Sequence, residues 1–284
     1  MVAEGFCWLK PGHNCGRVRI ILTGLILFLP SLCAAAEAGY CPPTKADAPQ
    51  VSSPPEEYSS FYKKYIDAGG IAILSPDKVC DRSLQLAYLI VSHMLEKRPD
   101  IRERLSDAKA RVVVCAIGQK QTDLPEFKQW ARKYSDAAHT RTYDGACGAT
   151  GFKDNPVSAT SEGNIIGDLD SVKGRSIFIH EFGHLIHNVG LDQNTRDEIS
   201  ELFKQAQAAQ LFPPNKGVPP SYAMSNEMEF FAMATMTWFS AAYWQAPFNS
   251  IHERNRETQA SHDPDLDRVL SEIYPADDWQ FPTR

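Results

Sequence analysis

The chain has no apolar run long enough to cross a bilayer as a helix. Its longest run, residues 20–29, has ten residues before Pro30, whereas a hydrocarbon core of about 30 Å needs roughly 20. Basic residues precede this run and the small residues 34–36 follow it, which is the order of a secretory signal peptide. We therefore expect cleavage near Ala36 or Ala38, secretion into the periplasm or medium, and no stable membrane insertion of the mature chain. An uncleaved anchor is the alternative.

The chain also has no surplus of basic residues. It contains 29 Lys and Arg against 35 Asp and Glu, a net charge of −6. Removing residues 1–36 leaves 284 − 36 = 248 residues with 26 basic and 34 acidic side chains, a net charge of −8. This balance argues against nucleic acid or an anionic membrane as a partner. A length of 248 residues allows one large domain or two small domains with a substantial core.

Cysteine is sparse and widely spaced after the expected cleavage site. Four remain there, Cys41, Cys80, Cys115 and Cys147, and no two lie within four residues of each other. That spacing makes a cysteine zinc site unlikely. In an exported chain four cysteines indicate two disulfides with three possible pairings; buried thiols are the alternative.

Repeats and nucleotide-binding loops are absent as well. Residues 144–151 are rich in glycine but contain no lysine and lack the spacing of a phosphate loop, so we interpret them as turns around a cystine. The only biased segment of the mature chain is proline-rich. We therefore divide the chain into a signal peptide at 1–36, a proline-rich leader at 37–55 outside the core, and one domain at 56–284.

Hydrophobic periodicity in this domain predicts an α+β fold. From Glu56 to the glycine pair at 69–70, aromatic residues recur at helical spacing and predict a packing face. The other predicted strands and helices follow from apolar runs and amphipathic periods. The strands lie at residues 71–74, 111–117 and 156–161, and the helices at 81–97, 125–134, 192–210 and 265–273.

The most informative stretch is His180-Glu181-Phe182-Gly183-His184 within an apolar run that continues to Val189. Histidines four residues apart lie on one face of a helix, so both imidazoles can bind one metal ion. Glu181 between them would take a proton from a water molecule held at the open position of the metal. Gly190 follows the last apolar position, where a C-cap glycine is expected. The pattern predicts a zinc-protease helix; a surface helix with incidental histidines is the alternative.

A catalytic zinc site needs a third protein ligand. Ten residues after His180, where a metzincin carries its third histidine, stands Gly190, which excludes that class. His187 shares only part of the helical face and is a weaker candidate. A second predicted helix begins near the N-cap candidate Ser225 and carries two acids in its first turn, Glu227 and Glu229. A glutamate ligand on a second helix is the gluzincin arrangement.

Two blocks of sequence resemble the catalytic domain of anthrax lethal factor and its relatives. They are His180-Glu-Phe-Gly-His184 and Ser221-Tyr-x-x-Ser-Asn-Glu-x-Glu-Phe-Phe-Ala232. The resemblance implies that Glu229 is the third zinc ligand and that Tyr222 stabilises the oxyanion of the tetrahedral intermediate. Met233 stands where the toxin carries an acid one turn after its ligand glutamate, so this chain lacks a carboxylate there to accept a hydrogen bond from a zinc-binding histidine.

Glu229 is also favoured over Glu227 by its helical face. Two positions on a helix differ by about 200°, so only one of the two acids can meet the histidines. Glu229 shares its face with Met233 and Met236, an apolar stripe suited to packing on the zinc helix. Glu227 lies near the helix start, where a carboxylate complements the dipole.

We therefore expect a zincin-like fold with a small mixed sheet, an HExxH active-site helix and a mainly helical C-terminal half. The expected function is a secreted zinc endopeptidase with one Zn²⁺ per chain, held by His180, His184 and Glu229. Glu181 and Tyr222 would be catalytic, and the partner would be a protein or peptide substrate whose backbone pairs with an edge strand at residues 156–161. The alternative is a zinc-stabilised binding protein of the same fold without turnover.

Overall fold

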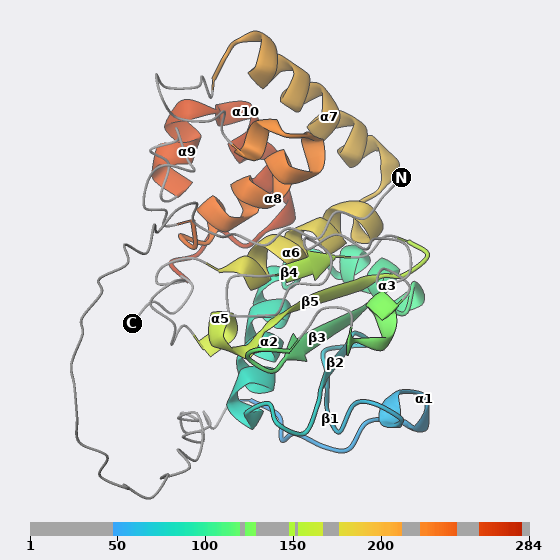
Figure 1. Cartoon of the computed structure of the whole chain (residues 1–284). Coiled ribbons are helices and arrows are strands. Elements are labelled where there is room, and N and C mark those ends of the chain that lie inside the picture. Colours follow the sequence, from blue (N-terminus) through green and yellow to red (C-terminus); the bar gives the residue numbers. More distant parts are fainter. Residues whose placement is uncertain are drawn as a thin grey trace, which may run out of the picture.

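The computed structural model describes residues 48–119, 123–128, 148–150, 153–166, 176–211, 222–242 and 256–279. The expected signal peptide lies outside these residues. Within them, a mixed sheet forms from the first half of the chain and helices make up the second half (Figure 1). The predicted α+β class is confirmed. A search of the described residues finds no helix that is both long and apolar enough for a membrane span.

The sheet has five strands in the order β1-β2-β3-β5-β4. They are β1 (Lys64–Asp67), β2 (Ala72–Ser75), β3 (Arg111–Cys115), β4 (Gly148–Thr150) and β5 (Val157–Ser161). The central pairs β2–β3 and β3–β5 are parallel, whereas β1 and β4 pair antiparallel at the two ends. The strands predicted at 71–74, 111–117 and 156–161 are therefore confirmed as strands. The last of them is not at the edge, because β4 covers its outer side.

The three central strands are buried at almost every position, as expected for parallel strands covered on both faces. Helix α2 (Asp81–Met94) packs on one side of the sheet, and α6 (Ile177–Leu185) lies along β4 and β5. Helix α8 (Glu227–Trp238) lies against the opposite side of α6 (Figure 1). Thus α6 is enclosed between the sheet and the helical half.

The remaining helical elements complete the two halves. They are α1 (Glu56–Ser59), α3 (Pro99–Asp107), η2 (Pro125–Phe127), α5 (Glu162–Ile166), η4 (Ile186–Gly190), α7 (Gln193–Ala208), η5 (Tyr222–Met224), α9 (Arg256–His262) and α10 (Pro264–Ile273). Helices α7 and α10 match the predictions at 192–210 and 265–273. Helix α2 ends three residues before the predicted Lys97, and Pro99 then opens α3, which was not predicted.

The aromatic segment after Glu56 does not keep its helical spacing. It forms one helical turn, and the chain then enters β1, where the backbone groups of Lys64–Asp67 pair with β2. Of the helix predicted at 125–134, residues 125–128 are described and contain the short turn η2. Residues 129–134 lie outside the described residues.

The end of the predicted leader belongs to the fold. Ser52 forms an antiparallel bridge with Tyr65 of β1, and the Gln85 side-chain amide donates to the Pro49 carbonyl over 3.1 Å. Val51 is partly buried against the main core. Residues at the end of the predicted leader therefore contact the domain.

Two of the four cysteines after residue 36 are described. Cys80, which precedes α2, is disulfide-bonded. Cys115 is a buried thiol at the end of β3, packed with Tyr62 and Phe127. This differs from the expectation that it pairs in a disulfide, since its apolar surroundings suit a small hydrophobic side chain.

Candidate metal centre

Helix α6 holds the motif in a fully buried position. All nine of its residues are buried, which suits a helix that is apolar on most sides and enclosed between two layers. Its N-terminus is fixed twice: the Ser176 hydroxyl accepts from the Ile179 amide over 3.1 Å, and the Asn164 side chain accepts from the Phe178 amide over 2.8 Å. The predicted helix is thus confirmed, and its capping leaves His180 and His184 one turn apart in a rigid element.

The helix ends in the π-helical turn η4 rather than in a left-handed cap. The Leu191 amide donates to the Ile186 carbonyl over 2.8 Å, and Gly190 is not among the residues with positive φ. A Cβ atom on Gly190 would lie 2.7 Å from Ile101 Cγ2 of α3. The glycine is therefore required by the close approach of α3, which corrects its expected role as a C-cap.

Helix α8 is positioned by its own cap and by a glycine on α6. The Asn226 side chain accepts from the Glu229 amide over 3.0 Å, so the N-cap is Asn226 and not the predicted Ser225. A Cβ atom on Gly183 would lie 3.4 Å from Thr235 of α8. The two helices are thus in direct contact here, and Glu229 of α8 lies beside the histidines of α6.

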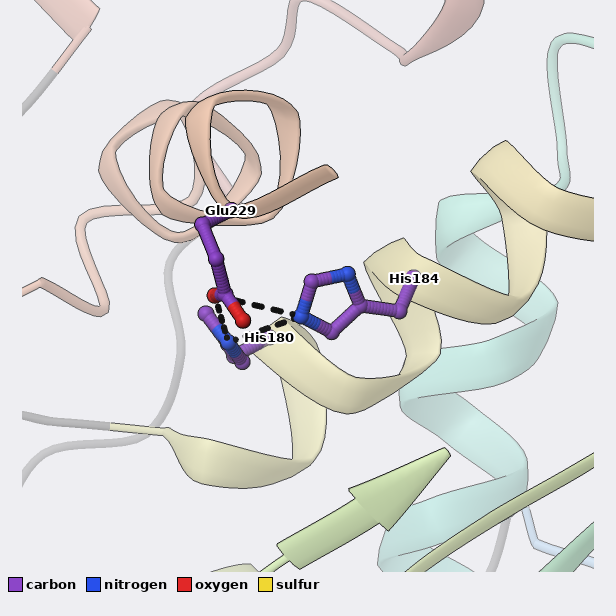
Figure 2. A group of neighbouring side chains, drawn as sticks. All are labelled: His180, His184 and Glu229. Atoms are coloured by element: carbon purple, nitrogen blue, oxygen red, sulfur yellow. Dashed lines mark hydrogen bonds and ion pairs between the residues drawn. The ribbon is translucent and has the colours of Figure 1, made fainter. Parts of the chain in front are cut away.

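Three side-chain atoms converge between these helices (Figure 2). The Nε2 atoms of His180 and His184 lie 3.1 Å apart, and Glu229 Oε2 lies 3.0 Å from the first and 3.3 Å from the second. All three residues are buried. The two histidines project from α6 and the carboxylate from α8, so the sequence motif and the distant glutamate meet at one point.

The spacing of these three atoms fits a metal ion. A triangle with sides of 3.0, 3.1 and 3.3 Å has a circumscribed radius of about 1.8 Å, less than the roughly 2.0–2.1 Å of Zn–N and Zn–O bonds. One point outside the plane of the triangle therefore lies at bonding distance from all three atoms. Two imidazoles and a carboxylate are also donors that four-coordinate zinc accepts. The group can thus hold a metal ion with a fourth position left over.

The charges of the group reinforce one another. Burial alone would raise the pKa of Glu229, but the charges and hydrogen bonds of His184 and His180 outweigh it and hold that pKa below its usual range. Burial would likewise lower the pKa of His184, yet the Glu229 carboxylate raises it above its ordinary value. A carboxylate that stays ionised although buried is suited to bind a cation.

Glu181 lies beside this group with its own hydrogen bond. Burial raises the pKa of its carboxyl, although the neighbouring histidines and Thr150 oppose the shift. The Thr150 hydroxyl lies 2.7 Å from Glu181 Oε2 and 2.8 Å from the Glu181 backbone oxygen. Thr150 was missed because it stands in the glycine-rich segment interpreted as turns. That segment ends in β4, and only the pairing of β4 with β5 places Thr150 at the helix.

Tyr222 lies in the turn η5, directly before α8. Its hydroxyl donates to Glu229 Oε1 over 2.7 Å, and its ring centroid is 6.2 Å from that of His180. The residue named by the family resemblance is therefore at the metal group. In this structure its hydroxyl contacts the oxygen of Glu229 that does not face the histidines.

The remaining candidates lie outside the metal group. His187 is buried in η4, with Nδ1 3.2 Å from Asn188 Oδ1, and burial lowers its pKa to about 4. Glu227, at the first position of α8, is half-buried and does not belong to the group. Met233 is buried in the main core. The structure thus places Glu229 in the group with His180 and His184, and Glu227 outside it.

A second group, His93, Glu96 and Asp277, could also hold a metal ion. Its two carboxylates face different ring nitrogens: Glu96 lies 3.4 Å from Nδ1 and Asp277 lies 3.4 Å from Nε2. Both carboxylates are more than half exposed, and Trp279 stacks on the imidazole at 4.6 Å. The arrangement suits a ring held between two acids better than three ligands that share one ion.

A scan against protein-family models finds no match to this chain, and a search of curated proteins finds none either. The resemblance to the lethal factor-like family therefore rests on the sequence blocks around His180 and Glu229 alone.

Proposed function

We propose that this chain is a secreted zinc-dependent endopeptidase of the gluzincin type, with a zincin-like fold and a relationship to the lethal factor-like family. The observation that carries the proposal is the convergence of His180, His184 and Glu229 beside the buried carboxylate of Glu181. Two imidazoles and one carboxylate are the donor set of catalytic zinc in this class of hydrolase. Secretion rests on the N-terminal sequence alone.

His180, His184 and Glu229 would hold the zinc ion. When bound, zinc lowers the pKa of a water ligand toward about 7 and polarises a carbonyl oxygen. The low pKa of Glu229 supports this assignment, since its carboxylate is ionised and available at neutral pH. One ion per chain follows from one group with this geometry among the described residues.

Glu181 would transfer the protons. It follows the first histidine ligand, and burial raises the pKa of its carboxyl, which brings it toward the range where a carboxyl can both accept and release a proton. Glu181 would take a proton from the attacking water and deliver it to the amine that leaves the scissile bond. A site that only binds metal needs no such carboxyl, and this favours an enzyme over the zinc-stabilised binding protein.

Tyr222 would stabilise the oxyanion. Its hydroxyl donates to Glu229 Oε1 in the absence of substrate, so it must turn from that oxygen to the substrate carbonyl as negative charge develops. A donor of this kind commonly contributes about 3 kcal/mol to transition-state stabilisation.

The substrate would be an extended segment of a protein or peptide. Strand β4 is at the end of the sheet and adjoins α6, so its outer backbone groups can add a strand beside the metal group. This replaces β5 as the expected pairing strand. Main-chain pairing gives affinity without dictating sequence, so a range of peptides is the suitable first probe.

The proposal is tested with the mature protein and casein or a mixed peptide library. We expect cleavage that is lost with a zinc chelator and restored by zinc. The control variant Glu181→Gln should retain zinc while activity falls at least about a hundredfold, since proton transfer by a positioned side chain contributes 10²–10⁴-fold. Stoichiometric zinc without cleavage by the natural protein would favour the binding protein.

A further inference from the structure

Strand β4 brings one hydroxyl against the carboxyl that would transfer protons. Thr150 Oγ1 lies 2.7 Å from Glu181 Oε2 and 2.8 Å from the Glu181 backbone oxygen. Both residues are buried, with exposed fractions of 7% for Thr150 and 6% for Glu181. The hydroxyl therefore has two acceptors within hydrogen-bond distance, and both belong to the same residue.

A hydroxyl suits a group that gains and loses a proton. It has one hydrogen to donate and two lone pairs that accept. When Glu181 is ionised, Thr150 can donate to Oε2. After Glu181 has taken a proton from water, the Oε2–H group can donate to Thr150 Oγ1, and the Thr150 hydrogen can turn to the Glu181 carbonyl. Each buried group keeps a partner in both states, which avoids the cost of leaving one unsatisfied.

A backbone amide at the same place would act differently. It can only donate, so it would favour the ionised carboxylate and oppose protonation. A methyl group would form no hydrogen bond with the carboxyl group in either protonation state. Because the terminal torsion of a glutamate has a broad, roughly twofold preference, the carboxyl group could then rotate. The hydroxyl on β4 therefore restricts the carboxylate without opposing proton transfer.

We propose that Thr150 is a positioning residue, whose buried hydroxyl holds the Glu181 carboxylate in one orientation beside His180 and His184. This inference rests on the proposed role of Glu181. It also links the two parts of the proposed site, since the strand that would pair with substrate carries the hydroxyl that orients the carboxyl.

The test compares Thr150→Val, which keeps the shape and removes the hydroxyl, with Thr150→Ser, which keeps the hydroxyl. We expect Thr150→Val to lower kcat by between about 10-fold and 100-fold, the scale of loss when a reacting group is misplaced. KM and zinc content should stay unchanged, and Thr150→Ser should restore most of the activity. In the Glu181→Gln background, Thr150→Val should cause little further loss, because the two residues act through one group.

Ser158→Ala is the matched control. Ser158 faces Thr150 across the β4–β5 pair, is buried, and its hydroxyl has no hydrogen-bond partner in the described part of the chain. The control should keep kcat, which separates the Glu181 contact from general effects on the sheet. Circular dichroism checks folding, and Thr150→Ala replaces Thr150→Val if the valine variant does not fold.

Several results would overturn the inference: an unchanged kcat in Thr150→Val, an equal loss in Thr150→Ser, or a full further loss in the Glu181→Gln background. Loss of zinc in Thr150→Val would also contradict it, because Thr150 would then stabilise the metal group as a whole and not the orientation of Glu181. These outcomes presuppose zinc-dependent cleavage by the natural protein. Its absence would overturn the proposed function, and the role of Thr150 with it.

Discussion

Replacing Glu229 and Glu227 separately tests which acid holds the metal. Glu229 Oε2 lies within 3.3 Å of both histidine nitrogens, so Glu229→Ala leaves two ligands of three. Loss of a residue that only orients a ligand typically weakens metal binding 10- to 100-fold. Loss of a direct ligand should exceed that range, and Glu229→Ala should therefore weaken zinc binding by more than about 100-fold and abolish activity.

Glu227→Ala should keep the metal. Glu227 is half-buried at the start of α8, where a carboxylate contributes about 0.3–1 kcal/mol through the helix dipole. The substitution should therefore reduce stability slightly while zinc content and cleavage remain near those of the natural protein. It controls for the loss of one negative charge close to the site.

Two measurements compare zinc binding by Glu229→Ala and Glu227→Ala. Zinc content is determined by mass spectrometry after dialysis against a weak chelator, and thermal unfolding is followed with and without zinc. At a zinc concentration of about 100 times Kd, binding stabilises the folded state by roughly 2.7 kcal/mol, which for a domain of this size raises Tm by about 5–11 °C. The natural protein and Glu227→Ala should show this rise, and Glu229→Ala should not. Stoichiometric zinc in Glu229→Ala, or zinc loss only in Glu227→Ala, would refute the assignment.

Two further predictions concern Tyr222 and the glycines of α6 and η4. Tyr222→Phe, measured at saturating zinc, should lower kcat about 100-fold with little change in KM, since it removes one oxyanion donor; an unchanged kcat would mean that another group serves the oxyanion. Gly190→Ala should destabilise the apoprotein by about 1–3 kcal/mol in urea unfolding, because its Cβ would lie 2.7 Å from Ile101 Cγ2. Gly183→Ala is the control with a Cβ contact of 3.4 Å, and equal loss of stability in both variants would contradict the argument.

The sequence predicts well those parts of the fold in which the spacing of apolar residues fits only one kind of secondary structure. Strand β3 is a run of valines between a polar residue and a cysteine, and it is buried at four of five positions. Helices α7 and α10 each have an aspartate cap and a clear apolar face. Local pattern and tertiary environment agree in these elements.

The aromatic segment after Glu56 shows where this agreement fails. Its spacing fits a helix, but Lys64–Asp67 pairs with Ala72–Ser75 in an antiparallel hairpin. The turn that joins these strands contains Gly69 and Gly70, both with positive φ. Glycines in that conformation are typical of tight turns between strands, so the glycine pair was the available signal for a hairpin.

The residues of the metal group also differ in how far the sequence predicts their positions. Helical spacing alone places His180 and His184 on one face, because the two residues are one turn apart. Glu229 could be selected from sequence only because two acids two positions apart cannot both face the histidines and because the spacing matches a known family. The apolar stripe does not distinguish a face, since every residue from Glu229 to Trp238 is buried. The packing of α6 on α8 places Gly183 opposite Thr235, and no local pattern gives that contact.

Neither helical spacing nor the family resemblance identifies Thr150. It is 31 residues from Glu181 in sequence, in a short segment with no strand periodicity of its own. Strand β4 has three residues and exists by pairing with β5, whose register sets Thr150 opposite Ser158. The hydroxyl reaches Glu181 because this sheet edge adjoins α6, so its contribution follows from topology and not from a motif. A conservative change at the end of a glycine-rich segment can therefore alter proton transfer at the helix without touching any residue that the HExxH pattern names.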